Sequence, residues 1–60
     1  MFKFELNEKV KVKVTGYQGC ITVAAKYLNG VNQYYIESID STGRPIGTWE
    51  YEERLERVED

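Results

Sequence analysis

Residues 15–30 read TGYQGCITVAAKYLNG, and the secondary structure of this stretch decides the fold. Alanine, lysine and leucine in its second half favour a helix. The flanks favour a strand, because Gly19 and the Asn29-Gly30 pair leave room only for a short helix without a cap, whereas Asn-Gly between apolar runs is a strong hairpin signal. We therefore expect a strand over residues 19–28, followed by a hairpin turn. The residues expected on one face of this strand are Ile21, Val23, Ala25 and Tyr27.

Alternating and turn-rich segments flank this stretch on both sides. Residues 8–14, EKVKVKV, alternate lysine with valine, which predicts a strand with a buried face of Val10, Val12 and Val14. The other expected elements are strands over residues 32–39, 46–51 and 56–58 and one helical turn over 52–55. In the strand over residues 32–39 the face-sharing residues are Tyr34, Ile36 and Ser38.

Five short strands with turn signals between them predict an all-β fold, a small closed or half-closed β-barrel formed by all 60 residues as one domain. The order of elements, with a short helical turn before the last strand, resembles the five-stranded SH3-like barrel. In that barrel the first and last strands lie side by side. This arrangement brings Lys9, Lys11 and Lys13 near Glu56 and Glu59, so that their charges neutralise across strands.

The composition argues against several kinds of site. The chain has no histidine and Cys20 is its only cysteine, so an internal disulfide and a Cys-His or Ser-His nucleophile pair cannot form. Zinc is not expected for the same reason, and no cofactor or catalytic residue is indicated. Residues 1–9 lack the apolar core of a signal peptide, and no segment approaches transmembrane length. We expect a cytoplasmic protein without a membrane segment.

Charge is divided unevenly along the chain. Residues 1–28 hold five lysines and two glutamates (+3), whereas residues 29–60 hold three arginines and eight acids (−5), which gives the net charge of −2. A basic surface is what attracts nucleic acid, and the acidic C-terminal half argues against such a partner. The lysines nevertheless offer candidate contacts for an anion. These candidates are Lys11, Lys13 and Lys26.

Aromatic residues are the other candidates for binding. Exposed tyrosine and tryptophan side chains can line a groove for an extended peptide. We expect such an exposed cluster at Tyr17, Tyr35 and Trp49. The alternative is structural: Tyr27 and Tyr34 form a cross-strand pair while Trp49 covers the core.

Residues 4–37 resemble a family of small phage and prophage proteins, mostly of unknown function. Their pattern runs Phe-x-Leu-Gly-Asp-x-Val, then Val-Thr-Gly-Phe-x-Gly, then Ile-x-Thr-Ala and Tyr-Leu-Asn-Gly. The matching residues are Phe4, Leu6, Val10, Val14, Thr15, Gly16, Gly19, Ile21, Thr22, Ala24, Tyr27, Leu28, Asn29 and Gly30, with a similar close at Leu55-Glu56-Arg57-Val58. Asn7 and Glu8 replace Gly-Asp, and Lys13 replaces an acid. The resemblance implies an SH3-like fold and an accessory role in a phage.

The chain is also similar, over shorter segments, to plasmid-borne type II dihydrofolate reductase, a small SH3-like barrel that works as a tetramer around a pore. Gln18-Gly19 and Leu55-Glu56-Arg57 carry this resemblance. In place of the Val-Gln-Ile-Tyr run that lines that pore, the chain has residues 48–51, in which only Tyr51 is retained.

Three functions follow from these features. The leading hypothesis is a non-catalytic phage or prophage binding module that recognises a host or phage protein. The first alternative is an oligomeric protein that binds or sequesters a nucleotide through its lysines. The second alternative is a reductase with its site in a pore between subunits. Both alternatives need a homo-oligomer, which the sequence leaves open.

Overall fold

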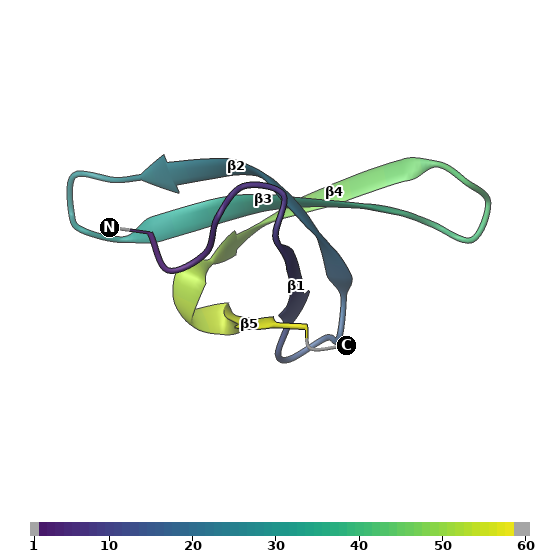
Figure 1. Ribbon diagram of the computed structural model, residues 1–60, viewed down its shortest axis with the longest axis horizontal. Coiled ribbons are helices and arrows are strands. Elements are labelled where there is room, and N and C mark those ends of the chain that lie inside the picture. Colours follow the sequence, from purple (N-terminus) through teal and green to yellow (C-terminus); the bar gives the residue numbers. More distant parts are fainter. Residues whose placement is uncertain (1, 59–60) are drawn as a thin grey trace.

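The computed structural model describes residues 2–58 and shows five antiparallel strands in one sheet (Figure 1). The elements are β1 (Lys9–Val12), β2 (Gln18–Lys26), β3 (Asn32–Ile39), β4 (Pro45–Tyr51), the 3₁₀ turn η1 (Glu52–Arg54) and β5 (Leu55–Arg57). The strand order is β4-β3-β2-β1-β5, so the first and last strands are neighbours. The predicted all-β, five-stranded SH3-like barrel with one helical turn before the last strand is confirmed.

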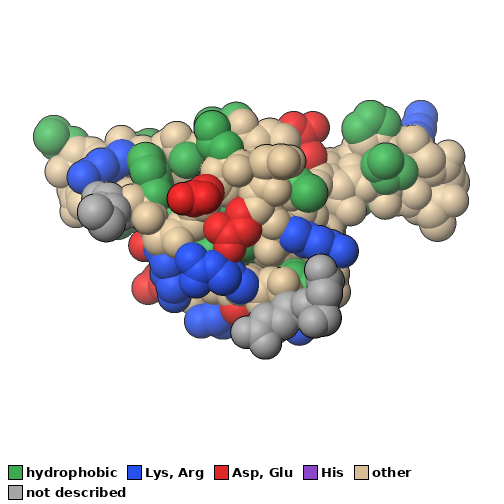
Figure 2. All heavy atoms as spheres, in the orientation of Figure 1, with side chains coloured by type: hydrophobic (Ala, Val, Ile, Leu, Met, Phe, Trp, Pro, Cys, Tyr) green, Lys and Arg blue, Asp and Glu red, His purple; other side chains and the backbone are tan. Residues whose placement is uncertain are grey.

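Two long hairpins give the molecule an extended outline. The β2–β3 and β3–β4 hairpins point in opposite directions, and β1 and β5 lie together on one side of them (Figure 1). The principal extents are 38, 22 and 20 Å. On the face shown in Figure 2, basic and acidic side chains gather over the half that holds β1, β5 and η1. Within residues 2–58, no helix has the length and apolar character needed to cross a membrane.

The hydrophobic core is formed by side chains of the strands together with Phe4 of the N-terminal segment. Tyr34 and Ile36 from β3 are fully buried, as the alternation of that strand predicts. The other buried apolar residues are Phe4, Val10, Val12, Ile21 and Leu55. Lys11 lies opposite Glu56 in the β1–β5 pair and its Nζ is 3.5 Å from the carboxylate, so the expected charge pairing between these strands is present. Glu59 lies outside the described residues.

The prediction that Val14 is buried is wrong. β1 ends at Val12, because the chain turns back there: the N–H of Val12 donates to Tyr17 O and the N–H of Gly16 donates to Val12 O. Gly16 has a φ of 77°, which glycine adopts without steric cost. Val14 is therefore at the tip of a turn and 77% exposed.

The predicted face of β2 is correct only up to Ile21. The register with β3 shifts between Ile21 and Val23, so Ile21 pairs with Ile36 but Val23 pairs with Tyr35. One extra residue in a strand turns the following side chains to the other face. Ala24 therefore packs against the core, while Val23 is 42% exposed and Tyr27 is 47% exposed.

Candidate functional site

An aromatic pair lies on the outward face of the β3–β4 hairpin. Tyr35 and Trp49 are directly opposite each other, with ring centroids 5.3 Å apart and planes tilted by 56°. Side chains alternate along a strand, so this face is opposite to the one that buries Tyr34 and Ile36. Trp49 is 48% exposed, so it does not cover the core. The alternative of a Tyr27–Tyr34 pair is also wrong, because Tyr34 is paired with Ala24.

The shifted register of β2 extends this pair into a row. Val23 pairs with Tyr35, and Tyr35 pairs with Trp49, so all three side chains line up across β2, β3 and β4. We call Val23, Tyr35 and Trp49 the outer row. Val23 also lines an open, mainly apolar groove of about 740 Å³. The other residues that line this groove are Phe2, Phe4, Glu5, Leu6, Thr22 and Ala24.

Gly47 fixes the position of the Tyr35 ring. A Cβ atom on Gly47 would overlap the Tyr35 hydroxyl oxygen and would be 2.5 Å from its Cζ. The ring therefore lies directly on the main chain of β4, beside Trp49. Sequence reasoning missed this role, although a glycine inside an expected strand is a known sign of close approach by another group.

Tyr17 is not part of the outer row. Its side chain packs, half-buried, against the core cluster, and its hydroxyl donates to Ile46 O at 3.3 Å. Burial raises the pKa of Tyr17 above 10.0. The structure thus brings together Tyr35 and Trp49, but places Tyr17 between the β1–β2 turn and β4.

The three candidate lysines do not converge on one site. Lys11 is ion-paired with Glu56, whereas the side chain of Lys13 is exposed. Lys26 is at the far end of β2, eight residues beyond Gln18, the partner of Lys11. That spacing corresponds to about 26 Å of extended strand. An anion bound by one copy of the barrel cannot contact Lys11 and Lys26 together.

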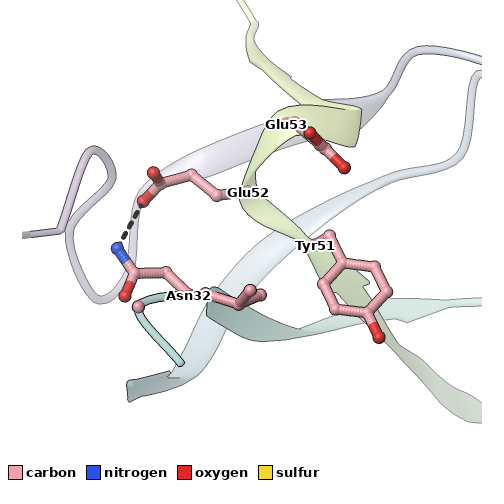
Figure 3. A pocket seen from close by; sticks show the side chains of 6 residues that line it. Asn32, Tyr51, Glu52 and Glu53 are labelled. Atoms are coloured by element: carbon pink, nitrogen blue, oxygen red, sulfur yellow. Dashed lines mark hydrogen bonds between the residues drawn. The ribbon is translucent and has the colours of Figure 1, made fainter. Parts of the chain in front are cut away.

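A carboxylate that sequence reasoning did not single out joins three segments of the chain. Glu52, in η1, lies beside a shallow cavity of about 250 Å³ together with Asn32, Tyr51 and Glu53 (Figure 3). One oxygen of Glu52 accepts hydrogen bonds from Asn32 Nδ2 at 3.1 Å, from the N–H of Lys3 at 3.0 Å and from the Tyr34 hydroxyl. This oxygen is occupied by the protein itself.

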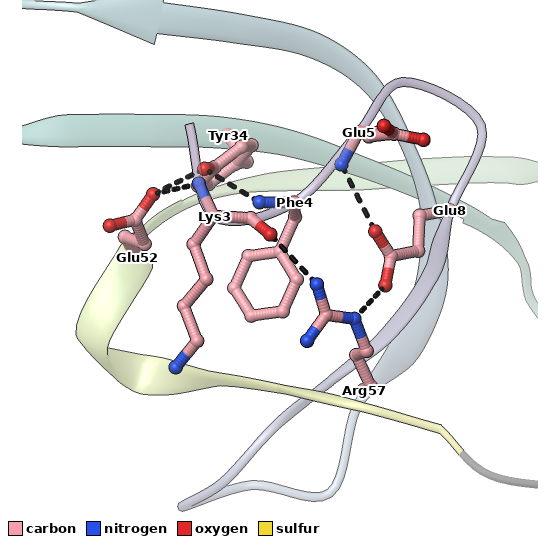
Figure 4. A network of polar contacts seen from close by, with 7 residues as sticks. All are labelled: Lys3, Phe4, Glu5, Glu8, Tyr34, Glu52 and Arg57. Carbon is pink, nitrogen blue, oxygen red and sulfur yellow. Dashed lines mark hydrogen bonds and ion pairs between the residues drawn. The ribbon is translucent and has the colours of Figure 1, made fainter. Parts of the chain in front are cut away.

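The same network holds Phe4 in the core (Figure 4). The Tyr34 hydroxyl accepts the N–H of Phe4, and the Arg57 guanidinium lies 5.2 Å from the centre of the Phe4 ring. Arg57 also donates to Glu8 at 2.7 Å and to Lys3 O at 2.9 Å. These contacts are structural: they fasten the N-terminal segment to β3 and β5. Within residues 2–58, no group of three His, Cys, Asp or Glu side chains is arranged to hold a metal ion.

Replacing Glu52 with glutamine is expected to weaken the acid sensitivity of the fold. The Tyr34 hydroxyl, which donates to the carboxylate, holds the pKa of Glu52 below 4.5. A carboxyl with a lower pKa in the folded state contributes stability above its unfolded pKa, and loses it as the pH falls through the folded pKa. Glu52→Gln should therefore cost about 1–3 kcal/mol at neutral pH and little in acid.

Denaturant unfolding at neutral and at acidic pH measures this difference. Glu53→Gln, one residue further along η1, is the matched control and should keep the wild-type profile. Some acid sensitivity should remain in Glu52→Gln, because the N–H of Glu5 lowers the pKa of Glu8 and the Thr42 hydroxyl lowers the pKa of Asp40. An unchanged pH profile in Glu52→Gln would contradict the assignment.

Comparison with protein-family models, with curated proteins and with solved structures finds no match to this chain.

Proposed function

We propose that this chain is a non-catalytic binding module that recognises an extended, apolar segment of a host or phage protein. The outer row carries the proposal, because it presents a tyrosine–tryptophan pair to solvent. Tyrosine and tryptophan dominate the binding energy of protein interfaces when a partner buries them. Val23 belongs both to the outer row and to the lining of the apolar groove, so a peptide that crosses Trp49 and Tyr35 would reach the groove by passing over Val23.

The Tyr35–Trp49 pair is also pre-organised for binding. The Tyr35 ring is held between the main chain at Gly47 and the Trp49 ring. A side chain that is already ordered loses less conformational freedom when a partner binds. The outer row therefore offers apolar area at a low entropic cost.

The phage or prophage context and the location in the host cytosol are part of the proposal. They rest on the resemblance of residues 4–37, and one backbone feature supports it. Asn7 has a φ of 70°, and its N–H donates to Ile21 O at 2.7 Å. Asparagine tolerates this left-handed conformation, and the phage pattern has glycine at the same place.

Replacing Trp49 with alanine is expected to abolish most peptide binding. Peptides selected from a random display library on the wild-type protein provide the probe, and titration calorimetry measures the affinity. Loss of a central aromatic contact typically costs at least 2 kcal/mol, which is about a 30-fold weaker Kd. The selected peptides should share apolar residues, in keeping with the groove at Phe2, Leu6 and Val23.

Two further variants make the test specific. Tyr27→Ala is the matched control, because Tyr27 is 47% exposed and Trp49 is 48% exposed. It should bind like the wild type. Gly47→Ala keeps both aromatic side chains but displaces the Tyr35 ring, and should weaken binding. Equal binding by wild type and Trp49→Ala would show that the outer row is not the contact surface.

A further inference from the structure

Within residues 2–58, β4 is at the edge of the sheet, so one row of its main-chain groups has no strand partner there. The N–H of Asp40 donates to Arg44 O, so these two residues form a hydrogen-bonded pair at the base of the hairpin loop. Hydrogen-bonded and non-bonded pairs alternate along antiparallel strands. The main-chain groups of Ile46, Thr48 and Glu50 therefore point to β3, and those of Gly47 and Trp49 point away from the sheet.

Pro45 agrees with this assignment. Proline has no N–H, so it is tolerated in a sheet where that group would point to solvent. Pro45 belongs to the same outward series as Gly47 and Trp49, and pairs with Ile39 without needing a bond from its nitrogen. Among the described residues, only the Thr48 hydroxyl makes a contact to this series, to Trp49 O at 3.5 Å.

This edge has few of the features that keep sheet edges apart: a proline at its first residue, Pro45, and one charged residue, Glu50. β4 is seven residues long and contains no lysine or arginine. Long edges with little charge tend to pair with another strand, whereas natural edges are often shortened or carry lysine. The opposite edge follows that rule: β5 is three residues long and includes Glu56 and Arg57. The β3–β4 hairpin also extends beyond β1 and β5, which leaves its end accessible (Figure 1).

We infer that β4 pairs, antiparallel, with β4 of a second copy of this chain, around a two-fold axis at Gly47. Charge complementarity points to a second copy. With Gly47 opposite Gly47 of the other copy, Arg44 comes opposite Glu50, which also lies 3.6 Å from Arg54 Nε of its own chain, and by symmetry this pairing occurs twice. Opposite charges directly across two strands stabilise their pairing, and like charges destabilise it.

The same register matches the remaining side chains. Pro45 comes opposite Trp49, so apolar surface meets apolar surface on the outward face. Ile46 comes opposite Thr48 on the other face. The N–H and C=O of Gly47 exchange hydrogen bonds with the C=O and N–H of Gly47 in the other copy. The N–H of Trp49 donates to the carbonyl of Pro45 in the other copy. The paired copies form one continuous sheet, in which the two outer rows lie on the same face.

Sedimentation velocity of the full chain at concentrations up to about 1 mM tests this pairing, because even a weak strand-edge dimer is populated there. The wild type should approach twice the 7.0 kDa mass of one chain. Ile46→Lys places a charge on the pairing strand and should remain a monomer. Arg44→Glu faces Glu50 with a like charge and should weaken the dimer about tenfold, less so in high salt.

Ile39→Lys is the matched control. Ile39 is the same residue type in the same hairpin, but it is on β3, where it pairs with Pro45 of its own chain and not with the second copy. This variant should dimerise like the wild type, and circular dichroism should show that all three variants are folded. If the wild type stays monomeric at the highest concentration, the inference is wrong. The β4 edge would then be available to a strand of another protein. A dimer that survives Ile46→Lys, or that Ile39→Lys disrupts equally, also overturns it.

The dimer and the proposed peptide binding can fail separately. Ile46 is on the face opposite to the outer row, so Ile46→Lys should still bind the selected peptides. Loss of dimerisation with peptide binding retained separates the two surfaces.

Discussion

Replacing Tyr34 with alanine is expected to unfold the domain. Tyr34 is fully buried, its ring contacts Phe4 and Phe2 edge-on at centroid distances of 5.6 and 6.0 Å, and its hydroxyl bonds to Glu52. Truncating a buried aromatic residue to alanine costs about 3–5 kcal/mol. A domain of this size has a total stability of only about 3–9 kcal/mol, at roughly 0.05–0.15 kcal/mol per residue. Circular dichroism and thermal melting at neutral pH measure the result.

Two neighbouring substitutions separate the ring from the hydroxyl. Tyr34→Phe keeps the ring but leaves the N–H of Phe4 without its acceptor, which should cost about 1–3 kcal/mol. Tyr35→Ala removes a ring of the same size from the outward face and should leave the domain folded. If Tyr34→Ala melts within a few degrees of the wild type, the core described here is wrong.

Replacing Gly19 with alanine is also expected to destabilise the domain. Gly19 is buried in β2, where a Cβ atom would lie 2.5 Å from Glu37 O and 2.6 Å from Ile36 Cγ2. The first neighbour is main chain, so the strands themselves must move apart. Overpacking of this kind costs about 1–3 kcal/mol, and each kcal/mol lowers the melting temperature by about 4–8 °C in a domain of this size.

Gly47→Ala is the informative comparison for Gly19→Ala. The new methyl group would also be too close to its neighbours, but these are atoms at the end of the Tyr35 side chain, which can rotate away. The loss of backbone freedom in the unfolded chain partly offsets the cost. Gly47→Ala should therefore change stability by less than about 1 kcal/mol. Equal destabilisation by the two substitutions would contradict this difference between main-chain and side-chain neighbours.

Much of the fold was predictable from residue patterns. Val10 and Val12 alternate with lysines, and Asn29-Gly30 marks a hairpin, so β1, β2 and their order follow from local chemistry. The register shift after Ile21 was not predictable. Thr22 is an ordinary strand residue, and neither glycine nor proline marks the extra position. Only the pairing with β3, which is set by the buried Ile36 and Tyr34, shows that the alternation breaks there.

The candidate surface was predictable only in part. Aromatic composition pointed to Tyr35 and Trp49, and the structure pairs them. Val23 joined them only because of the register shift, so a strict alternation assigned it to the wrong face. Tyr17 does not join them, because its position between Gly16 and Gly19 says nothing about the direction of its side chain, which packs against the core. The role of Glu52 could not be predicted among the many acids near the C-terminal end. Its three hydrogen-bond donors come from Lys3, Asn32 and Tyr34, which are far away in sequence.

The pairing of β1 with β5 determines when a newly synthesised chain can finish folding. β2, β3 and β4 are joined by short turns and can form a meander while translation continues. β1 emerges first but keeps one edge open until residues 55–57 have left the ribosome, because Val10, Lys11 and Val12 pair with Arg57, Glu56 and Leu55. Closure joins the most distant parts of the chain, and such contacts form slowly. A nascent chain stalled before Leu55 therefore leaves this edge of β1 unpaired, and unpaired strand edges favour aggregation.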